Sequence, residues 1–486
     1  MAQNGVSAEQ LAALRATVMG PALAPGDTGY EKAPPAWHGL GIPDYEEART
    51  LWNAGFDSRP AVIVQAMGVA DVQEALRFAR ANELPVAVRG GGHTPSGSST
   101  VDGGLVIDLR LMRGVHVDPE HRVAVALGGS LLADLDRECQ AYGLATTTGT
   151  VSHTGIGGLT LFGGVGRMMR KHGLTVDNVL AFDVVTAESE LLHVDVDNHP
   201  DLFWALRGGG GTFGVVTHFT YRLHPVGPIV YGGYLGWPIA QAKDVFLAVR
   251  EHLAAAPDDL QVQFIFCTAP EAEFIPVELQ GTRCLMMTAT WVGDDHEEAA
   301  RQIAPLRERV KPMLDVIGAF PYAFLQAASD PLAPHGRINV GVLPGFLDDL
   351  TEEIFDIGIA QAESFAGPLG VVEFSQMGGA VSRVPADATA VPASFRDSGY
   401  SYIVAQNCLD PADIEACREW TVAADAAFEP YRRPGRYVNF FSEDDEDAMR
   451  EAFGEENYER LMDIKATYDP DAVFSYSPNK RAAAVS

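Results

Sequence analysis

The residues best suited to chemistry lie in glycine-rich runs, the first of which is Arg89-Gly90-Gly91-Gly92-His93. Consecutive glycines tolerate positive φ and turn several backbone N–H groups toward one point, which is a way of binding phosphate. A neutral histidine imidazole is a nucleophile near neutral pH. The same pattern is also typical of an ordinary turn that ends in a loop histidine. The run alone leaves a phosphate-binding loop and a simple turn as alternatives.

A second glycine region, GTVSHTGIGGLTLFGGVG, covers residues 149–166 and carries no charged side chain. Surface loops usually contain Asp, Asn, Ser or Lys. An uncharged loop with two double glycines between apolar residues indicates backbone that packs closely against a flat or elongated ligand. Together, the two regions predict a site for a large phosphate-containing cofactor.

A third cluster, Gly208–Gly214, contains a formal G-x-G-x-x-G. The dinucleotide-binding fingerprint requires a strand before the glycines and a helix after them. Here the pattern predicts a helix before the glycines and a strand after them, which disfavours a nicotinamide-type site. The chain also lacks a P-loop, a G-x-S-x-G elbow, an H-E-x-x-H motif and paired C-x-x-C motifs, and we expect no metal site.

Composition narrows the possible partners. The 486 residues include 35 Lys and Arg against 65 Asp and Glu, a formal net charge of −30 that disfavours binding to nucleic acids or anionic membranes. No run of apolar residues is long enough to span a bilayer, and the N-terminus lacks the features of a signal peptide. The five cysteines are widely spaced and are expected to be buried thiols. We therefore expect a cytoplasmic protein whose oligomeric state the sequence leaves open.

The elements that must position the glycine clusters follow from hydrophobic periodicity. Two β-rich segments, 61–65 and 85–89, flank a predicted helix, so the first cluster begins where a strand ends. After residue 229 the pattern changes to strands interleaved with longer helices, such as Ala240–Ala255 and His296–Met313. The sequence predicts an α+β fold. Its expected parts are an N-terminal helix and loop at 1–55, a cofactor-binding domain at 56–228, a substrate domain at 229–435 and a C-terminal segment at 436–486 that returns to the cofactor-binding domain.

Several motifs in a fixed order resemble one known family. PVAVRGGGHTPSGSSTVDGGLVIDLR, the second glycine region and DLFWALRGGGGTFGVVT are similar to the FAD-binding domain of the berberine bridge enzyme-like oxidoreductases, within the vanillyl-alcohol oxidase superfamily. NYERLMDIKATYDPDAVF resembles the C-terminal signature of the same family. The resemblance covers most of the chain and is weakest in the middle domain. It implies a PCMH-type FAD-binding domain of two subdomains and a substrate domain whose antiparallel sheet is backed by helices.

The resemblance also implies which residues hold the cofactor. Members attach FAD covalently, through the imidazole of the R-G-G-G-H histidine to the flavin 8α-methyl group, and His93 occupies that position. Asn439 and Asn479 match family positions where the tail folds back over the cofactor domain. The expected cofactor-binding set is Arg89, Gly90, Gly91, Gly92, His93, Thr94, Gly97, Gly149, Val151, Thr154, Gly155, Gly157, Gly158, Leu159, Gly163, Gly164, Gly166, Gly214, Val216, Tyr437, Asn439 and Asn479.

Three of these positions depart from the family pattern. Val151 stands where doubly linked members have a cysteine, and valine cannot form a thioether, so attachment through His93 alone is expected. Leu159 replaces the histidine that follows the double glycine in the family. Thr154 aligns with the residue that governs oxygen access, usually small and aliphatic, which leaves oxidase and dehydrogenase behaviour both open.

The proton-accepting residue is a further departure. Many members use the last tyrosine of Y-x-N-Y, which is Phe440 here, and Tyr437 is expected to point elsewhere because residues three apart on a strand face opposite sides. On the expected strand Ser398–Gln406, Tyr402 is the candidate base, with Tyr400 behind it. A role in packing alone is equally compatible with both tyrosines. The expected substrate-binding residues are Tyr322 and Gln326, which resemble the family element P-Y-x-x-L-Q, together with Phe440 and Gln406.

The function implied by the resemblance is that of an FAD-dependent oxidase with a single histidyl link. A C–H bond of a small alcohol or amine, of the alkaloid or secondary-metabolite type, would donate hydride to flavin N5 while a base removes a proton. Molecular oxygen is the expected electron acceptor. The alternatives are a dehydrogenase that uses another acceptor and a flavin-binding protein whose catalysis has lapsed.

Overall fold

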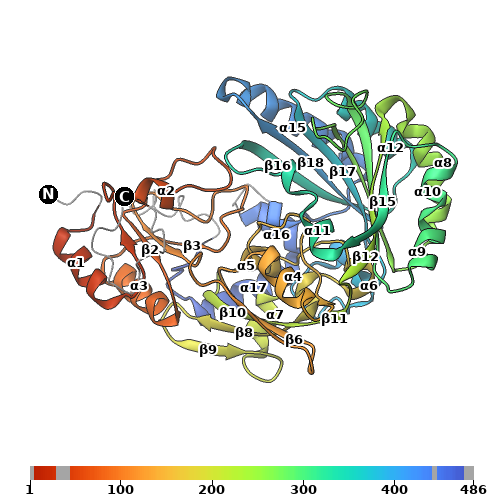
Figure 1. The fold of residues 1–486 in the computed structure, drawn as a ribbon. Helices are drawn as coiled ribbons and strands as arrows, with labels where there is room; N and C mark the ends of the chain where they lie inside the picture. The colour runs from red at the N-terminus through yellow and green to blue at the C-terminus, as the bar shows by residue number, and fades with distance from the viewer. Residues whose placement is uncertain (1–4, 29–43, 441–445, 476–486) are drawn as a thin grey trace.

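The computed structural model describes residues 5–28, 44–440 and 446–475, and its N-terminal part is built on a four-stranded sheet of order β1-β2-β4-β3 (Figure 1). Strands β2, β4 and β3 run parallel, and β1 is antiparallel to β2. These strands are almost continuously apolar, as expected where both faces of a parallel sheet are covered. The elements are α1 (Ala8–Thr17), β1 (Ala22–Leu23), α2 (Tyr45–Ala48), β2 (Val62–Gln65), α3 (Val69–Ala81), β3 (Val86–Arg89) and β4 (Leu105–Asp108).

The second part is an antiparallel sheet of order β5-β6-β10-β8-β9. Its apolar side packs against helices α4 and α7. The elements are β5 (Val115–Asp118), β6 (Val123–Leu127), α4 (Leu132–Gln140), β7 (Leu144–Ala145), α5 (Ile156–Leu161), α6 (Met169–His172), the 3-10 helix η2 (Thr175–Asn178), β8 (Val179–Val185), β9 (Leu191–Val194), α7 (Pro200–Leu206), β10 (Val215–Arg222) and β11 (His224–Pro225).

The third part is a seven-stranded antiparallel sheet of order β15-β12-β14-β13-β17-β18-β16. It comprises β12 (Ile229–Pro238), η3 (Ile239–Gln241), α8 (Ala242–Ala254), β13 (Leu260–Thr268), β14 (Arg283–Trp291), α9 (His296–Ile303), α10 (Pro305–Glu308), β15 (Leu314–Pro321), α11 (Tyr322–Ala327), η4 (Asp330–Leu332), β16 (Ile338–Leu347), α12 (Glu352–Glu363), β17 (Leu369–Gln376), α13 (Ala380–Arg383), α14 (Ala393–Arg396), β18 (Tyr400–Cys408), η5 (Pro411–Asp413), α15 (Ile414–Phe428) and η6 (Glu429–Tyr431). The prediction of an α+β fold with an antiparallel sheet backed by helices is confirmed.

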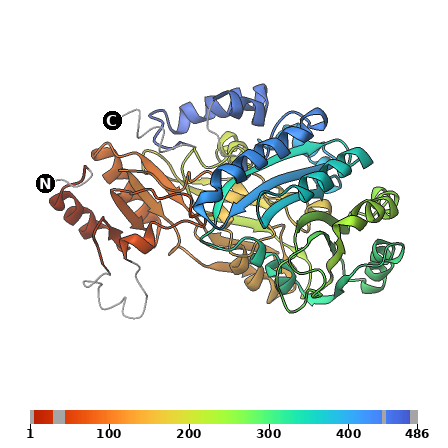
Figure 2. The same ribbon diagram turned by 90° about the horizontal axis from the view of Figure 1, so that it is seen from above.

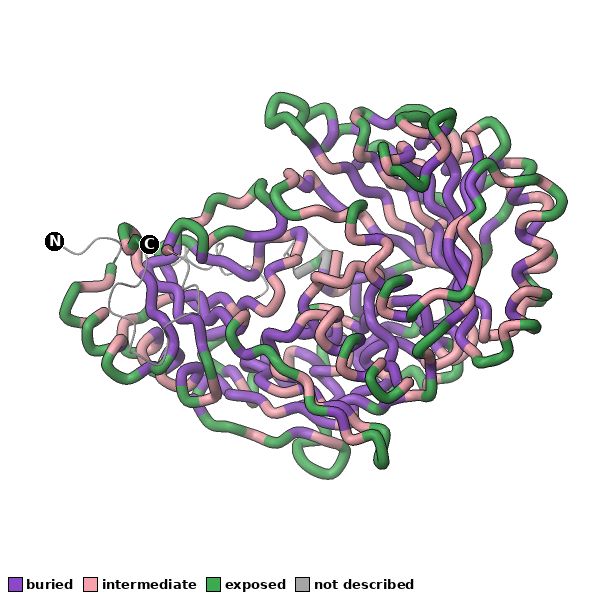
Figure 3. Tube along the Cα trace, in the orientation of Figure 1, coloured by how far each residue is buried: buried purple, intermediate pink, exposed green. Residues whose placement is uncertain are grey.

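The two faces of this seven-stranded sheet differ. One face packs against α8, α12 and α15 through a fully buried aromatic core that includes Phe246, Phe355, Phe374 and Phe428. Figure 3 shows the strands buried along most of their length, whereas the helices at the outside keep exposed surface. The opposite face is turned toward the N-terminal parts of the chain (Figure 1). Any site between the two halves of the molecule is therefore formed by that second face.

The C-terminal segment returns to the N-terminal half, where Figure 2 shows its helices lying across the molecule. It contains η7 (Val438–Phe440), α16 (Glu446–Phe453) and α17 (Glu455–Tyr468). Leu461 and Phe453 are buried against Phe213 and Trp204 in the core of the five-stranded sheet. Within the described residues, no helix combines the length and the apolar character required to cross a bilayer.

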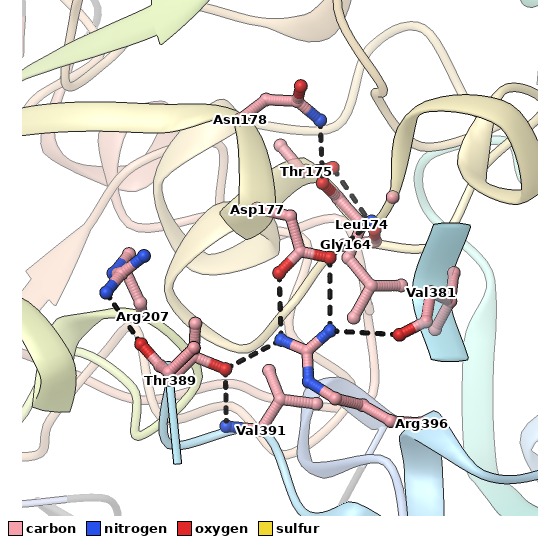
Figure 4. Close-up of polar contacts among 12 residues, drawn as sticks. Gly164, Leu174, Thr175, Asp177, Asn178, Arg207, Val381, Thr389, Val391 and Arg396 are labelled. Atoms are coloured by element: carbon pink, nitrogen blue, oxygen red, sulfur yellow. Dashed lines mark hydrogen bonds and ion pairs between the residues drawn. The ribbon is translucent and has the colours of Figure 1, made fainter. Parts of the chain in front are cut away.

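A buried ion pair joins the seven-stranded-sheet half to the N-terminal half (Figure 4). Arg396 Nη2 lies 2.8 Å from Asp177 Oδ1 and Arg396 Nη1 lies 3.1 Å from Asp177 Oδ2, so the contact is bidentate. The same guanidinium donates to Thr389 Oγ1 and to the carbonyl of Val381. Asp177 also accepts a hydrogen bond from the N–H of Leu174. Because Arg396 Nη1, Arg396 Nη2 and Asp177 Oδ2 each have two partners, the pair can fix how the two halves meet.

Candidate active site

A cavity of about 390 Å³ lies among the two N-terminal sheets, the seven-stranded sheet and the C-terminal segment. Most of the residues that the sequence predicted for the cofactor line it. They are Gly90, Gly91, Gly92, His93, Thr94, Gly149, Val151, Thr154, Gly155, Gly157, Gly158, Leu159, Gly214, Val216, Tyr437 and Asn439, with Phe440 from the predicted substrate set. Segments distant in the sequence thus form one wall, and that wall consists largely of backbone.

The need for glycine in this wall is steric. A Cβ atom on Gly91 would lie 2.3 Å from the backbone nitrogen of Gly155, and a Cβ on Gly155 would meet the nitrogen of Gly91 at the same distance. The two glycine regions therefore touch through their backbones. A Cβ on Gly158 would meet no atom within 4 Å, so the chain leaves open space beside this residue. The wall is shaped to hold a ligand directly against the backbone.

Five residues of the predicted cofactor set do not line the cavity. Arg89 is fully buried behind the loop, where its guanidinium donates to the carbonyl oxygens of Ala48 and Ser99 and lies 3.9 Å from Asp108. Burial lowers the pKa of Arg89 to about 10. Arg89 thus supports the loop from behind and is not placed to contact a phosphate. The others are Gly97, Gly163, Gly164 and Gly166, which lie outside helices and strands and are absent from the cavity lining. Asn479 lies outside the described residues.

Tyr437 and Phe440 both line the cavity, which corrects the expectation that Tyr437 points elsewhere. The segment Val438–Phe440 is a 3-10 helix and not a strand, and residues three apart in a 3-10 helix lie on one side. The two rings are 5.2 Å apart in an edge-to-face arrangement. The Tyr437 hydroxyl accepts hydrogen bonds from Gly164 N–H at 3.0 Å and Asn439 Nδ2 at 2.7 Å, and burial raises its pKa to about 12. Tyr437 is thus poorly suited to accept a proton.

A group of aromatic rings surrounds His93 at one end of the cavity. Trp52 stacks on the His93 imidazole at 4.8 Å, and His93 Nε2 lies 2.7 Å from Nδ1 of His153. His335, from the loop after α11, meets the His93 ring edge-on at 5.5 Å. Burial, with the charges of His153 and His335, lowers the pKa of His93 to about 3. The His93 imidazole is therefore neutral and keeps one lone pair at physiological pH.

Tyr402 is not at the cavity, and the prediction that it is the base is contradicted by its surroundings. It lies in the aromatic core between the sheet and α15, 1% exposed, with its ring 4.8 Å from that of Phe428. Its hydroxyl donates to Asp425 Oδ1 at 2.8 Å, and burial raises its pKa. Tyr400 and Gln406 lie on the same helix-covered face and do not line the cavity. Tyr402 therefore packs, which was the alternative interpretation.

Tyr322 and Gln326 also lie away from the cavity, in the contact between α11 and α4. Gln326 is 1% exposed, and its Nε2 donates to Thr148 Oγ1 at 2.7 Å and to the carbonyl of Gly149 at 3.0 Å. Tyr322 is fully buried. Gln326 therefore supports the second glycine region from below, although the sequence predicted a place in the substrate cleft. Next to it, burial raises the pKa of Asp136 to about 7.

A carboxyl group that the sequence analysis did not single out, Glu373 on β17, lies on the face of the seven-stranded sheet that contributes Val342 to the cavity, although Glu373 is not itself one of the lining residues. Val342 on β16 lines the cavity and pairs with Ala405 on β18, which in turn pairs with Val371 on β17. Paired residues share a face and alternate residues return to it, so Glu373 lies on the same side as Val342. Tyr402 pairs with Phe374 on the other side.

Hydrogen bonds hold the Glu373 carboxylate in place. Its Oε1 accepts from Ser375 Oγ at 2.7 Å and from Gln263 Nε2 at 2.9 Å. Burial raises the pKa of Glu373, although Ser375, the charge of Arg167 and Gln263 oppose the shift. Arg167 is itself buried and donates through Nη2 to Tyr234 Oη at 3.1 Å. The arrangement provides a half-buried carboxyl with an elevated affinity for a proton, as a general base requires.

The structure adds other cavity residues that the sequence analysis missed. They include Trp52, Ser96, Ser98, Ser99, Gly211, Thr212, Val342, Met449, Phe474 and Ser475. Ser96, Ser98 and Ser99 lie within six residues after His93 in the sequence, so this polar stretch was an available signal. Gly211 belongs to the third glycine cluster, which indeed lies between a helix, α7, and a strand, β10. That cluster therefore contributes to the cavity without forming a nicotinamide-type motif.

Comparison with known proteins identifies the cofactor. Family models described as "FAD binding domain" and "Berberine and berberine like" match residues 60–195 and 436–479. An FAD-linked oxidoreductase of Aspergillus fumigatus, hasG, is 31% identical over 453 residues, which cover 88% of this chain and 92% of that protein. The (R)-6-hydroxynicotine oxidase of Paenarthrobacter nicotinovorans is 29% identical over 449 residues, covering 90% of this chain and 94% of that oxidase.

Solved structures agree with these matches. The 6-hydroxy-D-nicotine oxidase of Arthrobacter nicotinovorans superposes with a TM-score of 0.80 at 26% identity, covering 95% of this chain and 98% of that chain. The xylooligosaccharide oxidase of Myceliophthora thermophila has the same fold, with a TM-score of 0.78 at 21% identity over 97% of this chain and 98% of that one. The backbone wall and the open space beside Gly158 fit FAD, a long ligand with a flat ring system. The chain belongs to the berberine bridge enzyme-like, PCMH-type FAD-linked oxidoreductases.

Proposed function

We propose that this oxidoreductase is an oxidase whose FAD is attached through His93 alone. It takes hydride from a C–H bond next to an alcohol or amine of a small molecule of the alkaloid or secondary-metabolite type, and molecular oxygen accepts the electrons. When bound, the flavin supplies the redox chemistry, and the protein supplies position and proton transfer. The observation that carries the proposal is the neutral imidazole of His93 on the wall of the glycine-lined cavity.

Single attachment is supported by Val151, which lines the cavity where doubly linked members place a cysteine. All five cysteines of the chain, Cys139, Cys267, Cys284, Cys408 and Cys417, are buried, and none belongs to the cavity lining. A second thioether link therefore has no thiol to form it among the lining residues. The substrate class is supported by the similarity to the nicotine oxidase, whose name specifies a small hydroxylated alkaloid.

Glu373 replaces Tyr402 in our assignment of the base. Its carboxyl lies on the cavity side of the sheet, whereas Tyr402 donates its proton to Asp425 inside the helix-covered core. A carboxylate held by Ser375 and Gln263 can accept a proton from a substrate O–H or N–H as the neighbouring C–H bond loses hydride. The presence of this carboxyl also argues against the lapsed flavin-binding protein, which was considered because Phe440 cannot accept a proton.

Two measurements test the proposal. After denaturation, flavin fluorescence should remain with the polypeptide and should be lost in His93→Ala; release of free flavin from the native sequence would refute the covalent link. Anaerobic stopped-flow reduction with a panel of alcohols and amines, including 6-hydroxynicotine, then tests the base. We expect Glu373→Gln to slow reduction by about 10²–10⁴-fold. The matched variant Tyr402→Phe should reduce at the wild-type rate, and the reverse order would refute the assignment.

A dehydrogenase remains the second candidate because Thr154 lies on the cavity wall at the position that governs oxygen access in the family. Its hydroxyl makes this position polar, where an aliphatic side chain is usual. Reoxidation of the reduced enzyme in aerated buffer separates the two functions. Fast return of the flavin absorbance supports the oxidase, and slow return that accelerates with an artificial electron acceptor supports the dehydrogenase.

A further inference from the structure

We propose that Arg167 binds an anionic group of the substrate, so that the molecule oxidised by this enzyme carries a carboxylate besides its alcohol or amine. The inference rests on the proposed function and narrows its substrate class. Arg167 comes directly after the second glycine region, two residues beyond Val165, which lines the cavity. Neither the motifs in the sequence nor the assignment of Glu373 as the base accounts for a buried arginine at this position.

Most of the hydrogen-bonding capacity of Arg167 is unused. The residue is 2% exposed, and its Nη2 donates to Tyr234 Oη at 3.1 Å and to Ser329 Oγ at 2.9 Å. Its Nε and Nη1 atoms are buried and have no hydrogen-bond partner among the described residues. Buried polar groups are normally paired, because leaving them unpaired costs free energy. The N–H groups of Nε and Nη1 are therefore available to a bound ligand.

The positive charge of Arg167 also lacks a carboxylate partner in the described part of the chain. Asp330, next to Ser329, accepts instead from the N–H and Oγ of Ser152, at 2.7 and 2.5 Å. Glu373 is close enough for the charge of Arg167 to act on its pKa, but the two groups are not in ion-pair contact. A buried charge is costly without a counter-charge. A bound anion removes that cost, which a neutral water molecule cannot do.

The hydroxyl groups beside the guanidinium add to a site that consists mainly of donors. Tyr234 Oη and Ser329 Oγ lie 2.9 Å apart, and each accepts from Arg167 Nη2. One hydroxyl hydrogen forms the bond between these two oxygens, so the other hydrogen is free to donate to a ligand. Arginine itself has no acceptor atom. The unused groups therefore match the oxygens of a carboxylate and not an ammonium group.

The seven-stranded sheet brings this site to the same face as the proposed base. Tyr234 on β12 pairs with Thr288 on β14. Thr288 pairs with Gln263 on β13, and Gln263 pairs with Ser375 on β17. Ser375 and Glu373 are alternate residues of β17, so Tyr234 and Glu373 share one face of the sheet. A substrate held by its carboxylate at the guanidinium can thus present its O–H or N–H to the Glu373 carboxyl.

The phosphates of FAD are a second source of negative charge, and the lining of the cavity separates them from this site. The cavity that fits FAD is lined by the backbone of Gly90, Gly91 and Gly92, whereas Arg167 is not among its lining residues. Backbone N–H groups in such a loop suit a phosphate. The substrate is therefore the ligand that we assign to Arg167, and the cofactor content of Arg167 variants tests this choice.

The test uses the flavin-loaded enzyme and three small carboxylates, each paired with the amide of the same shape: benzoate with benzamide, phenylacetate with phenylacetamide, and nicotinate with nicotinamide. Binding is measured from the change in flavin absorbance at constant ionic strength, so no turnover is needed. In the wild type we expect at least one acid to bind about 10- to 100-fold more tightly than its amide. Arg167→Met should abolish this preference, and Arg167→Lys should retain part of it.

Arg283→Met is the matched control. Arg283 lies on β14 of the same sheet and donates to the carbonyls of Phe365 and Gly367. Its replacement removes one positive charge and should leave the preference for acids unchanged. Ser329→Ala removes a hydroxyl beside the guanidinium and keeps the charge, so it should weaken binding of the acid and leave binding of the amide as it is.

Equal binding of acids and amides to the wild type, or a preference that survives in Arg167→Met, would overturn the inference. Loss of FAD from Arg167→Met would overturn it as well, because the charge would then serve the cofactor. If Arg167→Met does not fold, Ser329→Ala decides, and unchanged acid binding in that variant counts against the site. Failure of the proposed function is separate, since these titrations measure binding whether or not the flavin is covalently attached or reacts with oxygen.

Discussion

Replacing Asp136 with asparagine should stabilise the protein at alkaline pH and should do so less at acidic pH. Asp136 lies on α4 and is 2% exposed, in the contact with α11. Its nearest polar partners are Gln326 Nε2 and Thr148 Oγ1, both at 3.4 Å, and no cation lies in ion-pair contact with it among the described residues. Among the described residues, the Oε1 atom of Gln326 has no hydrogen-bond partner. A protonated Asp136 carboxyl, or the amide of asparagine at this position, can donate a hydrogen bond to it.

The size of the effect follows from the shift in pKa. Burial raises the pKa of Asp136 from 3.8 to about 7, although the bonds from Gln326 and Thr148 oppose the rise. A group with a raised pKa in the folded state contributes its full stability below the unfolded pKa and loses it as pH rises through the folded pKa. Three pKa units correspond to about 4 kcal/mol, of which about 3 kcal/mol is lost between pH 5 and pH 8.

The assay is guanidinium unfolding of wild type and Asp136→Asn at pH 5 and pH 8, with tryptophan fluorescence as the probe. The free-energy advantage of the variant should grow by about 3 kcal/mol between the two pH values. Asp134→Asn on the same helix is the control. Burial raises the pKa of Asp134, but the hydrogen bonds from Arg113 and the Leu131 N–H outweigh it and lower this pKa overall. The difference in unfolding free energy between Asp134→Asn and wild type should therefore stay constant between pH 5 and pH 8. If the difference in unfolding free energy between Asp136→Asn and wild type were the same at both pH values, the reasoning would be refuted.

Three further predictions address the cavity and the contact between the two halves. Gly91→Ala places a Cβ 2.3 Å from a backbone nitrogen, so the melting temperature and the FAD content should both fall, whereas Gly158→Ala should lower the FAD content and leave the melting temperature of the flavin-free chain unchanged. Arg396→Met leaves Asp177 buried without its cation and should lower the free energy of unfolding by about 3–5 kcal/mol, and the double variant with Asp177→Asn should recover part of it. Because burial raises the pKa of Glu373, anaerobic flavin reduction should speed up as pH rises through that pKa; a rate independent of pH between pH 4 and pH 9 would contradict a base with this pKa.

Local sequence patterns predicted most of the glycines that line the cavity because the reason for these glycines is local. Gly91 and Gly155 must be glycine because their backbones are in contact. A run of glycines can be recognised in the sequence without knowledge of the fold. Hydrophobic periodicity likewise predicted α8 to within a few residues at each end. It failed for His296–Met313, where the chain forms α9 and α10 and then enters β15. Pro305 begins α10 there, and a proline cannot continue the hydrogen bonding of the preceding helix.

What the sequence determined by itself was therefore the family, its FAD cofactor and the set of residues that share a face of each strand. The tertiary structure alone decided which face of β17 and β18 meets the cavity. Alternation places Tyr402 and Glu373 on opposite sides, and the packing of α15 against one side buries the tyrosine and leaves the carboxyl on the other. It also brought His153 and His335 to His93, because contacts between segments so far apart in the chain depend on how the domains pack and leave no periodic signal in either segment.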